Sequence, residues 1–239
     1  MPVKFSNMGT LYIVATPIGN LQDITLRALE TLEKADYIAC EDTRVSKNLI
    51  KHYFKENEQN MLEKLFSYYE ENELQKTPQV INLLLNGKNV ALISDAGTPT
   101  ISDPGFKLVR ECIKIGIKVV PIPGPSSVIA ALVTSGLPTD RFTFLGFLPQ
   151  KKGHRLKILE KTWEVQKILN STVIVFESPH KIITTLREIR QVFGNIDITV
   201  SRELTKIHEE IKCETIDNVI ESSKNHNIKG EITILFNLK

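Results

Sequence analysis

Short apolar runs alternate with amphipathic stretches along the whole chain. Apolar runs predict strands at residues 11–15, 37–40, 90–94, 118–121, 141–147, 172–176, 197–200 and 231–238. Apolar positions at three- and four-residue spacing predict helices at residues 24–35, 45–55, 70–86, 106–115, 128–134, 155–169, 182–193 and 214–222. Strands that alternate with helices predict an α/β fold whose sheet is largely parallel.

Local signals refine this pattern. Asp23 is expected to cap the helix that follows it. Residues 57–63 are polar and predict a loop, and Pro78 fits its helix only near the start or at a kink. The Pro- and Gly-rich stretch at 121–125 predicts a boundary between two α/β domains, residues 1–122 and 123–239.

Four loops that follow predicted strands carry unusual residues: 16–20, 95–105, 121–127 and 177–180. Ligands of open α/β sheets bind at the carboxyl ends of the strands, where such loops present backbone groups. Turn chemistry alone explains Pro and Gly in any single loop. Four such loops, two of them rich in Gly, Pro, Ser and Asp, favour a ligand cleft.

The composition excludes several classes of protein but does not indicate a binding partner. The chain is 41% apolar, and 30 Lys and Arg against 28 Asp and Glu leave a net charge of +2, too small to indicate nucleic acid by itself. The three cysteines are far apart and form no C-x-x-C pair, which predicts neither a disulfide framework nor a zinc site. The first ten residues lack the apolar core of a secretory signal, and the longest apolar run is 128–133. We therefore expect a cytoplasmic protein that does not bind the membrane.

Several common cofactor and metal motifs are absent from the sequence. It contains no G-x-x-x-x-G-K-[ST], no G-x-G-x-x-G, no H-E-x-x-H and no G-x-S-x-G. We therefore expect neither a phosphate cradle of the usual kind nor a bound metal ion.

Three polar segments have both a structural and a functional interpretation. Asp95, directly after a predicted strand, either begins a turn or contacts a ligand hydroxyl or ammonium group. The segment 41–44 is either an acidic helix start or a polar wall of the cleft. The basic row 150–155 is either a solvated loop or a contact for a phosphate backbone.

Seven motifs then occur in a fixed order: TPIGNL at 16–21, EDTR at 41–44, SDAGTPTISDPG at 94–105, PGPSS at 123–127, GFLP at 146–149, ESPH at 177–180 and RELTK at 202–206. In this order they resemble the tetrapyrrole methylase superfamily, over residues 9–239. Within it they are similar to the branch that methylates ribosomal RNA of the small subunit, rather than to the precorrin methylases or diphthine synthase. One departure is Lys181, which stands where that branch has Arg after ESPH.

The resemblance implies two α/β domains with a cleft for S-adenosylmethionine between them, the first domain also lying on the substrate side. It implies 2′-O-methylation of a cytidine ribose in the decoding region of 16S rRNA, with the small ribosomal subunit as partner, and a homodimer. It places cofactor contacts at Pro17, at Asp95, Ala96, Gly97 and Thr98, at Ser126 and Ser127, and at Glu177.

The sequence does not single out a catalytic base. The candidates near the ribose hydroxyl are Glu41, Asp42 and Lys206. Phosphate contacts are expected from Arg44, Lys151, Lys152 and Arg202, and also from Lys206.

Two other functions stay open at this point. The chain could be another methylase of the superfamily that acts on a small molecule or a protein, which predicts no dependence on RNA. It could also be a non-catalytic RNA-binding module that kept the fold, which predicts no binding of the methyl donor.

Overall fold

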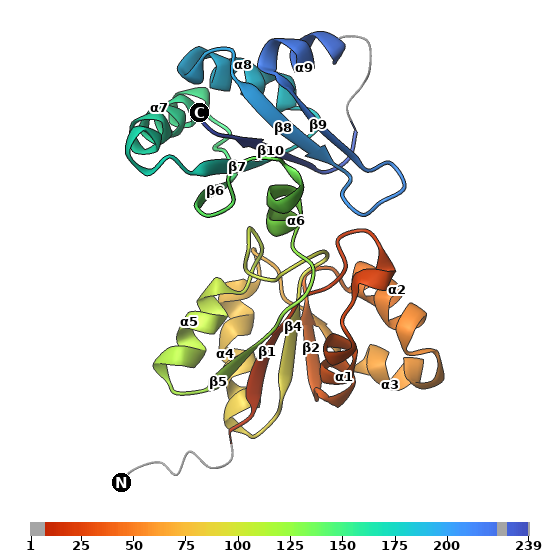
Figure 1. Cartoon of the computed structure of the whole chain (residues 1–239). Coiled ribbons are helices and arrows are strands. Elements are labelled where there is room, and N and C mark those ends of the chain that lie inside the picture. Colours follow the sequence, from red (N-terminus) through yellow and green to blue (C-terminus); the bar gives the residue numbers. More distant parts are fainter. Residues whose placement is uncertain (1–7, 224–228, 239) are drawn as a thin grey trace. The chain divides into compact units, whose positions relative to one another are not determined.

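A computed structural model describes residues 8–223 and 229–238 (Figure 1). The chain divides into two compact units, residues 1–126 and 127–239, each built on one five-stranded sheet. The predicted boundary after residue 122 stays a prediction. Most of the segment searched for a secretory signal lies outside the described residues. No helix within those described ranges is long and apolar enough to cross a membrane.

The sheet of the first unit is entirely parallel, with strand order β3-β2-β4-β1-β5. Its strands are β1 (Thr10–Val14), β2 (Tyr37–Cys40), β3 (Leu65–Ser67), β4 (Val90–Ile93) and β5 (Lys118–Ile122). Its helical segments are η1 (Leu21–Asp23), α1 (Leu26–Lys34), α2 (Thr43–Tyr53), η2 (Lys55–Asn57), α3 (Glu58–Glu63), α4 (Glu73–Leu85) and α5 (Phe106–Lys114). Because all five strands run the same way, their carboxyl ends share one edge of the sheet.

Helices cover both faces of this sheet (Figure 1). On β4, Ala91 and Ile93 pack with residues of α1, α2 and α3. Val90 and Leu92 pack with residues of α4 and α5 on the other face. A strand buried on both sides has no polar face, and this explains the uninterrupted apolar run that predicted it.

Two local predictions in the first unit are wrong. The N-cap of α1 is Thr25, whose Oγ1 accepts the Ala28 N–H at 3.1 Å, whereas Asp23 lies in η1. Residues 57–63 are mostly the helix α3 rather than a loop. This helix buries only Met61 completely, so its apolar periodicity is too weak to detect.

The second sheet, with order β6-β7-β10-β8-β9, is mostly antiparallel. Its strands are β6 (Phe142–Phe147), β7 (Thr172–Glu177), β8 (Asp197–Arg202), β9 (Glu210–Thr215) and β10 (Ile232–Phe236). Only β6 and β7 pair in parallel, because β10 runs antiparallel between β7 and β8, and β9 returns as a hairpin. The predicted parallel sheet is therefore confirmed for the first unit and wrong for the second.

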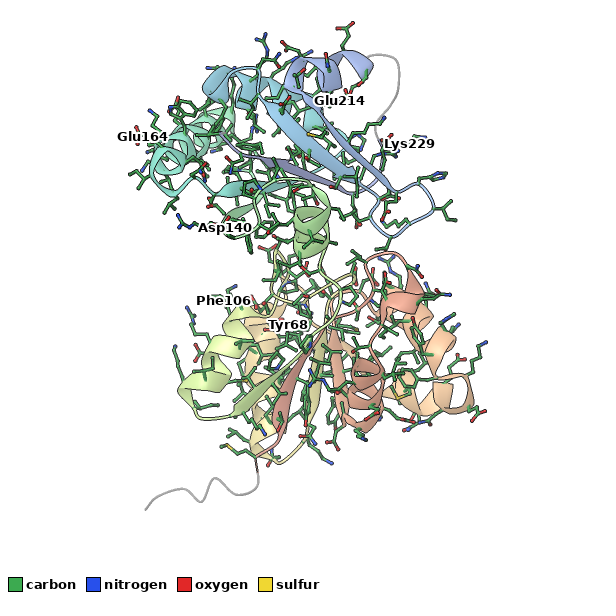
Figure 2. The ribbon with its side chains drawn as sticks, in the orientation of Figure 1. Tyr68, Phe106, Asp140, Glu164, Glu214 and Lys229 are labelled. Atoms are coloured by element: carbon green, nitrogen blue, oxygen red, sulfur yellow. The ribbon has the colours of Figure 1, made fainter. Side chains whose placement is uncertain are left out.

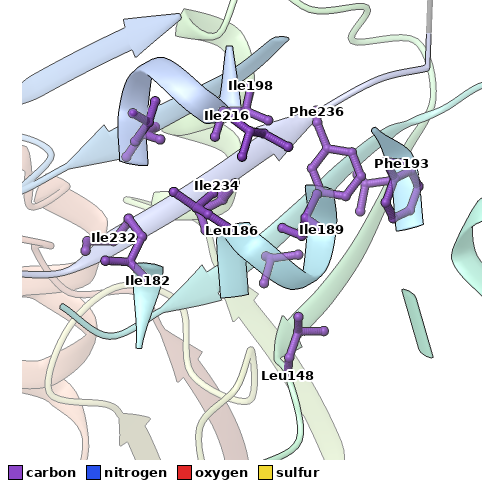
Figure 3. Close-up of a cluster of buried hydrophobic side chains, with 14 of the residues drawn as sticks. Leu148, Ile182, Leu186, Ile189, Phe193, Ile198, Ile216, Ile232, Ile234 and Phe236 are labelled. Carbon is purple, nitrogen blue, oxygen red and sulfur yellow. The ribbon is translucent and has the colours of Figure 1, made fainter. Parts of the chain in front are cut away.

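The helices of the second unit lie on opposite faces of its sheet. They are α6 (Ser127–Thr134), α7 (Lys152–Leu169), α8 (Ile182–Phe193) and α9 (Ile216–Ser222). Ile198, Ile234 and Phe236 of the sheet pack with residues of α8 and α9 (Figure 3). Leu159 of α7 belongs to the same cluster. On the other face Thr199 donates its hydroxyl to the Ser135 carbonyl, 3.0 Å away, just after α6. The edge strand β9 was not predicted, because its half-exposed residues show no regular alternation.

Candidate active site at the carboxyl edge of the first sheet

The loop after β1 is tied to the loop after β4. The Thr16 N–H donates to the Gly97 carbonyl at 2.9 Å, and the Gly97 N–H donates to the Thr16 carbonyl at 3.0 Å. The Thr16 hydroxyl also donates to the Ser94 carbonyl at 3.2 Å. Gly97 has φ 81°, and a Cβ there would lie 3.2 Å from Ile18 Cγ2, so glycine fits this approach best. Pro17 is buried beside this bridge.

The loop after β5 joins the same assembly. The Thr98 hydroxyl donates to the Pro125 carbonyl at 3.0 Å. Gly124 passes so close to the end of β1 that a Cβ would lie 3.0 Å from Ala15 Cβ. Three loops that the sequence placed around one ligand therefore lie together at one edge. Of the two predicted serines, Ser126 ends the first unit and Ser127 begins α6 of the second.

The loop between β4 and α5 has a strained backbone. Thr100 and Ser102 adopt φ values of 74° and 63°, in the left-handed region that costs a non-glycine residue about 1–3 kcal/mol. Such strain persists where the surroundings hold it, and it clusters at functional sites.

A buried carboxylate on α4 holds the end of this loop. Glu73, only 4% exposed, accepts the Gly105 N–H at 3.0 Å and pairs with Lys107 Nζ at 2.9 Å. The hydroxyl of buried Tyr68, labelled in Figure 2, lies 3.3 Å from Glu73. Burial opposes its ionisation, but Lys107 and the Gly105 N–H hold the pKa of Glu73 below its ordinary value. Sequence reasoning missed Glu73, because one glutamate at a helix start carries no signal of a contact 32 residues away.

The segment after β2 brings further carboxylates to the edge. Asp42 caps α2 by accepting the Arg44 N–H at 2.8 Å, and its carboxylate pairs with the Arg44 guanidinium at 2.6 Å. These contacts lower the pKa of Asp42 to about 2. The Asp42 N–H in turn donates to Asp95 Oδ1 at 2.9 Å, which links this segment to the loop after β4.

At three other carboxyl groups of this edge, the surroundings disfavour the charged form. Partial burial raises the pKa of Asp95, and the Asp42 N–H offsets only part of that rise. Partial burial and the charges of Asp103 and Asp95 raise the pKa of Glu41. Burial, aided by Asp95 and opposed by a hydrogen bond with Ser94, raises the pKa of Asp103 to about 6. Asp103 was not among the predicted residues.

Within residues 8–223 and 229–238, these three carboxylates form no ion pair with a lysine or arginine, and no cluster of three or more His, Cys, Asp or Glu is placed to hold a metal ion. The edge therefore carries negative charge that suits a cationic ligand or a group that gives up a proton.

Glu177 belongs to the second unit, where its carboxylate is used locally. Its Oε1 accepts the Ser178 N–H at 2.7 Å, and its Oε2 accepts the Thr185 hydroxyl. The side chain is buried at the point where β7 leads to α8. Its predicted contact with a cofactor stays a prediction.

Lys206 and Arg202 lie where β8 turns into β9. Lys206 Nζ lies 2.9 Å from a carboxylate oxygen of Glu203 and 2.9 Å from one of Glu231. Partial burial opposes the charge, but the two carboxylates raise the pKa of Lys206, so the amine stays protonated. Arg202 is 3.3 Å from Glu210.

The other predicted phosphate contacts are exposed. Lys151 precedes α7 and Lys152 opens it, and the Arg44 side chain is 88% exposed on α2. The structure thus gathers Glu41, Asp42, Arg44, the first two cofactor loops and Ser126 in the first unit, whereas Ser127 belongs to the second. It places Lys151, Lys152, Glu177, Arg202 and Lys206 in the second.

Comparisons with known proteins agree with this architecture. Residues 10–220 match the family model described as Tetrapyrrole (Corrin/Porphyrin) Methylases. The chain is 47% identical over 233 residues to the ribosomal RNA small subunit methyltransferase I of Mycoplasmopsis pulmonis, covering 97% of this chain and 99% of that protein. It is 45% identical to the protein of that name from Halalkalibacterium halodurans, over 95% and 75% of the two chains. A crystal structure of diphthine synthase shares the fold, with a TM-score of 0.67 at 15% identity over 95% of this chain and 90% of that one. The predicted α/β fold of tetrapyrrole-methylase type is thus confirmed.

Proposed function

The chain belongs to the tetrapyrrole methylase family, and from this premise we propose that it transfers a methyl group from S-adenosylmethionine to the 2′-hydroxyl of a cytidine in the decoding region of 16S ribosomal RNA. The proposed substrate is the small ribosomal subunit. One observation carries the proposal: 45–47% identity, over 95–97% of the chain, to proteins named ribosomal RNA small subunit methyltransferase I.

The first-unit edge fits a donor of this kind. S-adenosylmethionine supplies a methyl group already activated by a positively charged sulfur. Carboxylates without ion-pair partners, such as Asp95, favour positive charge beside them. In this proposal Pro17, the residues 95–98, Ser126, Ser127 and Glu177 hold the donor. These loops then serve mainly to align the reacting atoms, and alignment of this kind can supply about 7–11 kcal/mol.

We assign the proton acceptor to Glu41. A general base gains from a pKa above that of a free carboxylate, and partial burial together with the charges of Asp103 and Asp95 raises the pKa of Glu41 above its ordinary value. The Asp42 carboxylate is neutralised by Arg44, and Lys206 is protonated between two glutamates. In the proposed role, a carboxylate oxygen of Glu41 takes the proton of the ribose hydroxyl.

Arg44, Lys151, Lys152 and Arg202 are the proposed phosphate contacts, since each presents a guanidinium or ammonium group on a partly or fully exposed side chain. The homodimer and the cytoplasmic location remain predictions.

The first experiment incubates the purified protein with methyl-labelled S-adenosylmethionine and unmodified small ribosomal subunits, and then maps the label. Label on the ribose of one cytidine is the expected result. A thermal shift with the donor, about 2.7 kcal/mol of added stability at 100 times its Kd, is measured in parallel. A shift without label on RNA would move the substrate to a small molecule or a protein. If the protein shows no thermal shift with the donor and no label appears on RNA, the result contradicts enzymatic methyl transfer.

A further inference from the structure

The GFLP motif at 146–149 takes no part in the chemistry proposed above, yet it contains a bulge. Phe144 lies opposite Ile174 and Phe147 lies opposite Phe176, so three residue steps on β6 match two on β7. Gly146, inside this bulge, has φ 63°. Residues three apart on a regular strand face opposite sides, so the bulge turns Phe147 to the side on which Phe144 lies.

The two rings share one support. The centroids of Phe144 and Phe147 lie 4.8 and 5.5 Å from that of Phe176, in edge-on and tilted arrangements. The neighbours Val173 and Val175 point into the core under α7 and α8, so Phe176 lies on the opposite face of the sheet. Phe147 is 61% exposed. A ring held from one side and open on the other suits stacking with a nucleobase.

Positive charge follows this ring along the chain. Residues 148–159 contain no Asp or Glu, and the first acidic residue after Phe147 is Glu160. Lys151 and Lys152 are exposed, and neither forms an ion pair with a residue of the described ranges. An aromatic ring followed within five residues by two unpaired ammonium groups complements a base and its neighbouring phosphates.

A buried arginine fixes the turn between the ring and the lysines. Arg155 Nη1 donates to the carbonyls of Pro149 and Gln150 at 3.1 and 2.6 Å. Its Nε and Nη2 donate to the two carboxylate oxygens of Glu188 on α8, at 2.6 and 2.8 Å. Arg155 and Glu188 are 8% and 4% exposed. The backbone that leads from Phe147 to Lys151 is thus held to α8 in one conformation.

We propose that Phe147, Lys151 and Lys152 form one contact surface for a single-stranded segment of the RNA substrate. A base stacks on the Phe147 ring, and the lysines contact the phosphates beside it. Arg155 is a positioning residue that keeps ring and lysines in register. This inference rests on the proposed function, since it assumes that the substrate is RNA.

The test compares two phenylalanines of the same strand. Phe147→Leu removes the ring and keeps an apolar side chain, and Phe142→Leu is the matched control, since Phe142 is 43% exposed at the other end of β6. Phe147→Leu is expected to raise KM for small subunits about tenfold, with donor Kd and melting temperature unchanged. Phe142→Leu should leave KM unchanged, and Phe147→Trp should restore it. Trp163 is the only tryptophan of the wild-type chain, so added quenching of Phe147→Trp emission by protein-free 16S rRNA would report the stack directly.

The outcomes separate this inference from the proposed function. If Phe147→Leu methylates small subunits with wild-type kinetics, the proposed contact surface is wrong and the proposed methyl transfer still stands. Quenching by intact subunits but not by protein-free RNA would also overturn it, in favour of a ribosomal protein as the partner. If the wild-type protein labels no RNA, the proposed function fails, and the quenching experiment still decides whether Phe147 stacks on single-stranded RNA.

Discussion

Three carboxylates at the edge of the first sheet differ from two carboxylates near the β8–β9 hairpin in how their charge is compensated. At the edge of the first sheet, the pKa values of Glu41, Asp95 and Asp103 are all raised. In the second unit Lys206 lowers the pKa of Glu203, and Lys212 lowers that of Glu210.

This difference shows that charged groups have two different roles in the molecule. Paired charges in the second unit fix the hairpin and the turn before α7. Uncompensated carboxylates in the first unit cost stability, and such costs persist where a ligand or a reaction uses the group. The strained Thr100 and Ser102 occur at the same edge as these carboxylates. This contrast supports the proposed placement of the chemistry at the first sheet.

The largest expected effect tests the base. Glu41→Gln keeps the shape of the side chain and removes its basicity, so the single-turnover rate of methyl transfer should fall by about 10²–10⁴-fold. Lys206→Ala is the comparison, and its rate on RNA should stay within a few-fold of wild type. A normal rate for Glu41→Gln with a strongly reduced rate for Lys206→Ala would move the chemistry to the second unit.

The second largest expected effect is the loss of stability when one charge of a buried ion pair in the second unit is removed. Glu188→Ala leaves Arg155 buried without its carboxylate, and removing one partner of a buried pair costs about 3–5 kcal/mol. Urea unfolding measures the change. Glu164→Ala, on the exposed surface of α7 (Figure 2), should change stability by less than about 0.5 kcal/mol. Equal effects of the two substitutions would show that the ion pair does not hold this unit.

A third substitution reverses the charge of one carboxylate at the edge of the first sheet. Asp95→Arg places a cation where the donor's positive charge is proposed to lie and removes the acceptor of the Asp42 N–H. Donor affinity by calorimetry should fall about 100-fold, or about 2.7 kcal/mol. Asp140→Arg in the second unit, where the aspartate side chain is 75% exposed, serves as the charge-matched control. Wild-type affinity for Asp95→Arg would disprove the placement of this loop at the cofactor.

The smallest expected effect is the change in unfolding free energy when one carboxylate is neutralised, and its sign differs between Asp103 in the first unit and Glu203 in the second. The pKa of Asp103 is about 6 in the folded protein, above its ordinary 3.8, so the folded state binds the proton more tightly than the unfolded state. The unfolding free energy should therefore fall as pH rises from about 4 to 6.

Asp103→Asn should remove this slope and add on the order of 1 kcal/mol at pH 7, after allowance for solvent screening. Glu203→Gln should lower stability instead, because Lys206 loses a partner. Denaturant titrations at pH 4, 6 and 7 compare the two variants. Stabilisation by both substitutions would remove the contrast between the units.

Elements whose signal is local could be predicted from the sequence. The buried runs of β1 and β4 and the Gly- and Pro-rich loops after them predicted a ligand edge, and the structure joins those loops through Thr16 and Gly97. Residues whose role depends on distant partners could not be predicted. Glu73 contacts Gly105 across 32 residues, and Arg155 contacts Glu188 across 33. Asp103 stands before Pro104 and Gly105, where it resembles an ordinary turn residue.

Strand direction in the second unit was missed for the same reason. Apolar patterning reveals that β10 is buried but not which neighbours it joins, and its antiparallel place between β7 and β8 depends on contacts across 30 residues or more.

The central place of β10 also sets an order of events during synthesis. Each strand of the first sheet has been made once Ile122 emerges, so that unit can fold while the rest of the chain is still being translated. The second sheet cannot join β7 to β8 until Ile232–Phe236 arrives, because β10 lies between them. A nascent chain that stalls before residue 232 would therefore carry a folded first unit and an open second one, with the unpaired backbone edges of β7 and β8 exposed to proteases and chaperones.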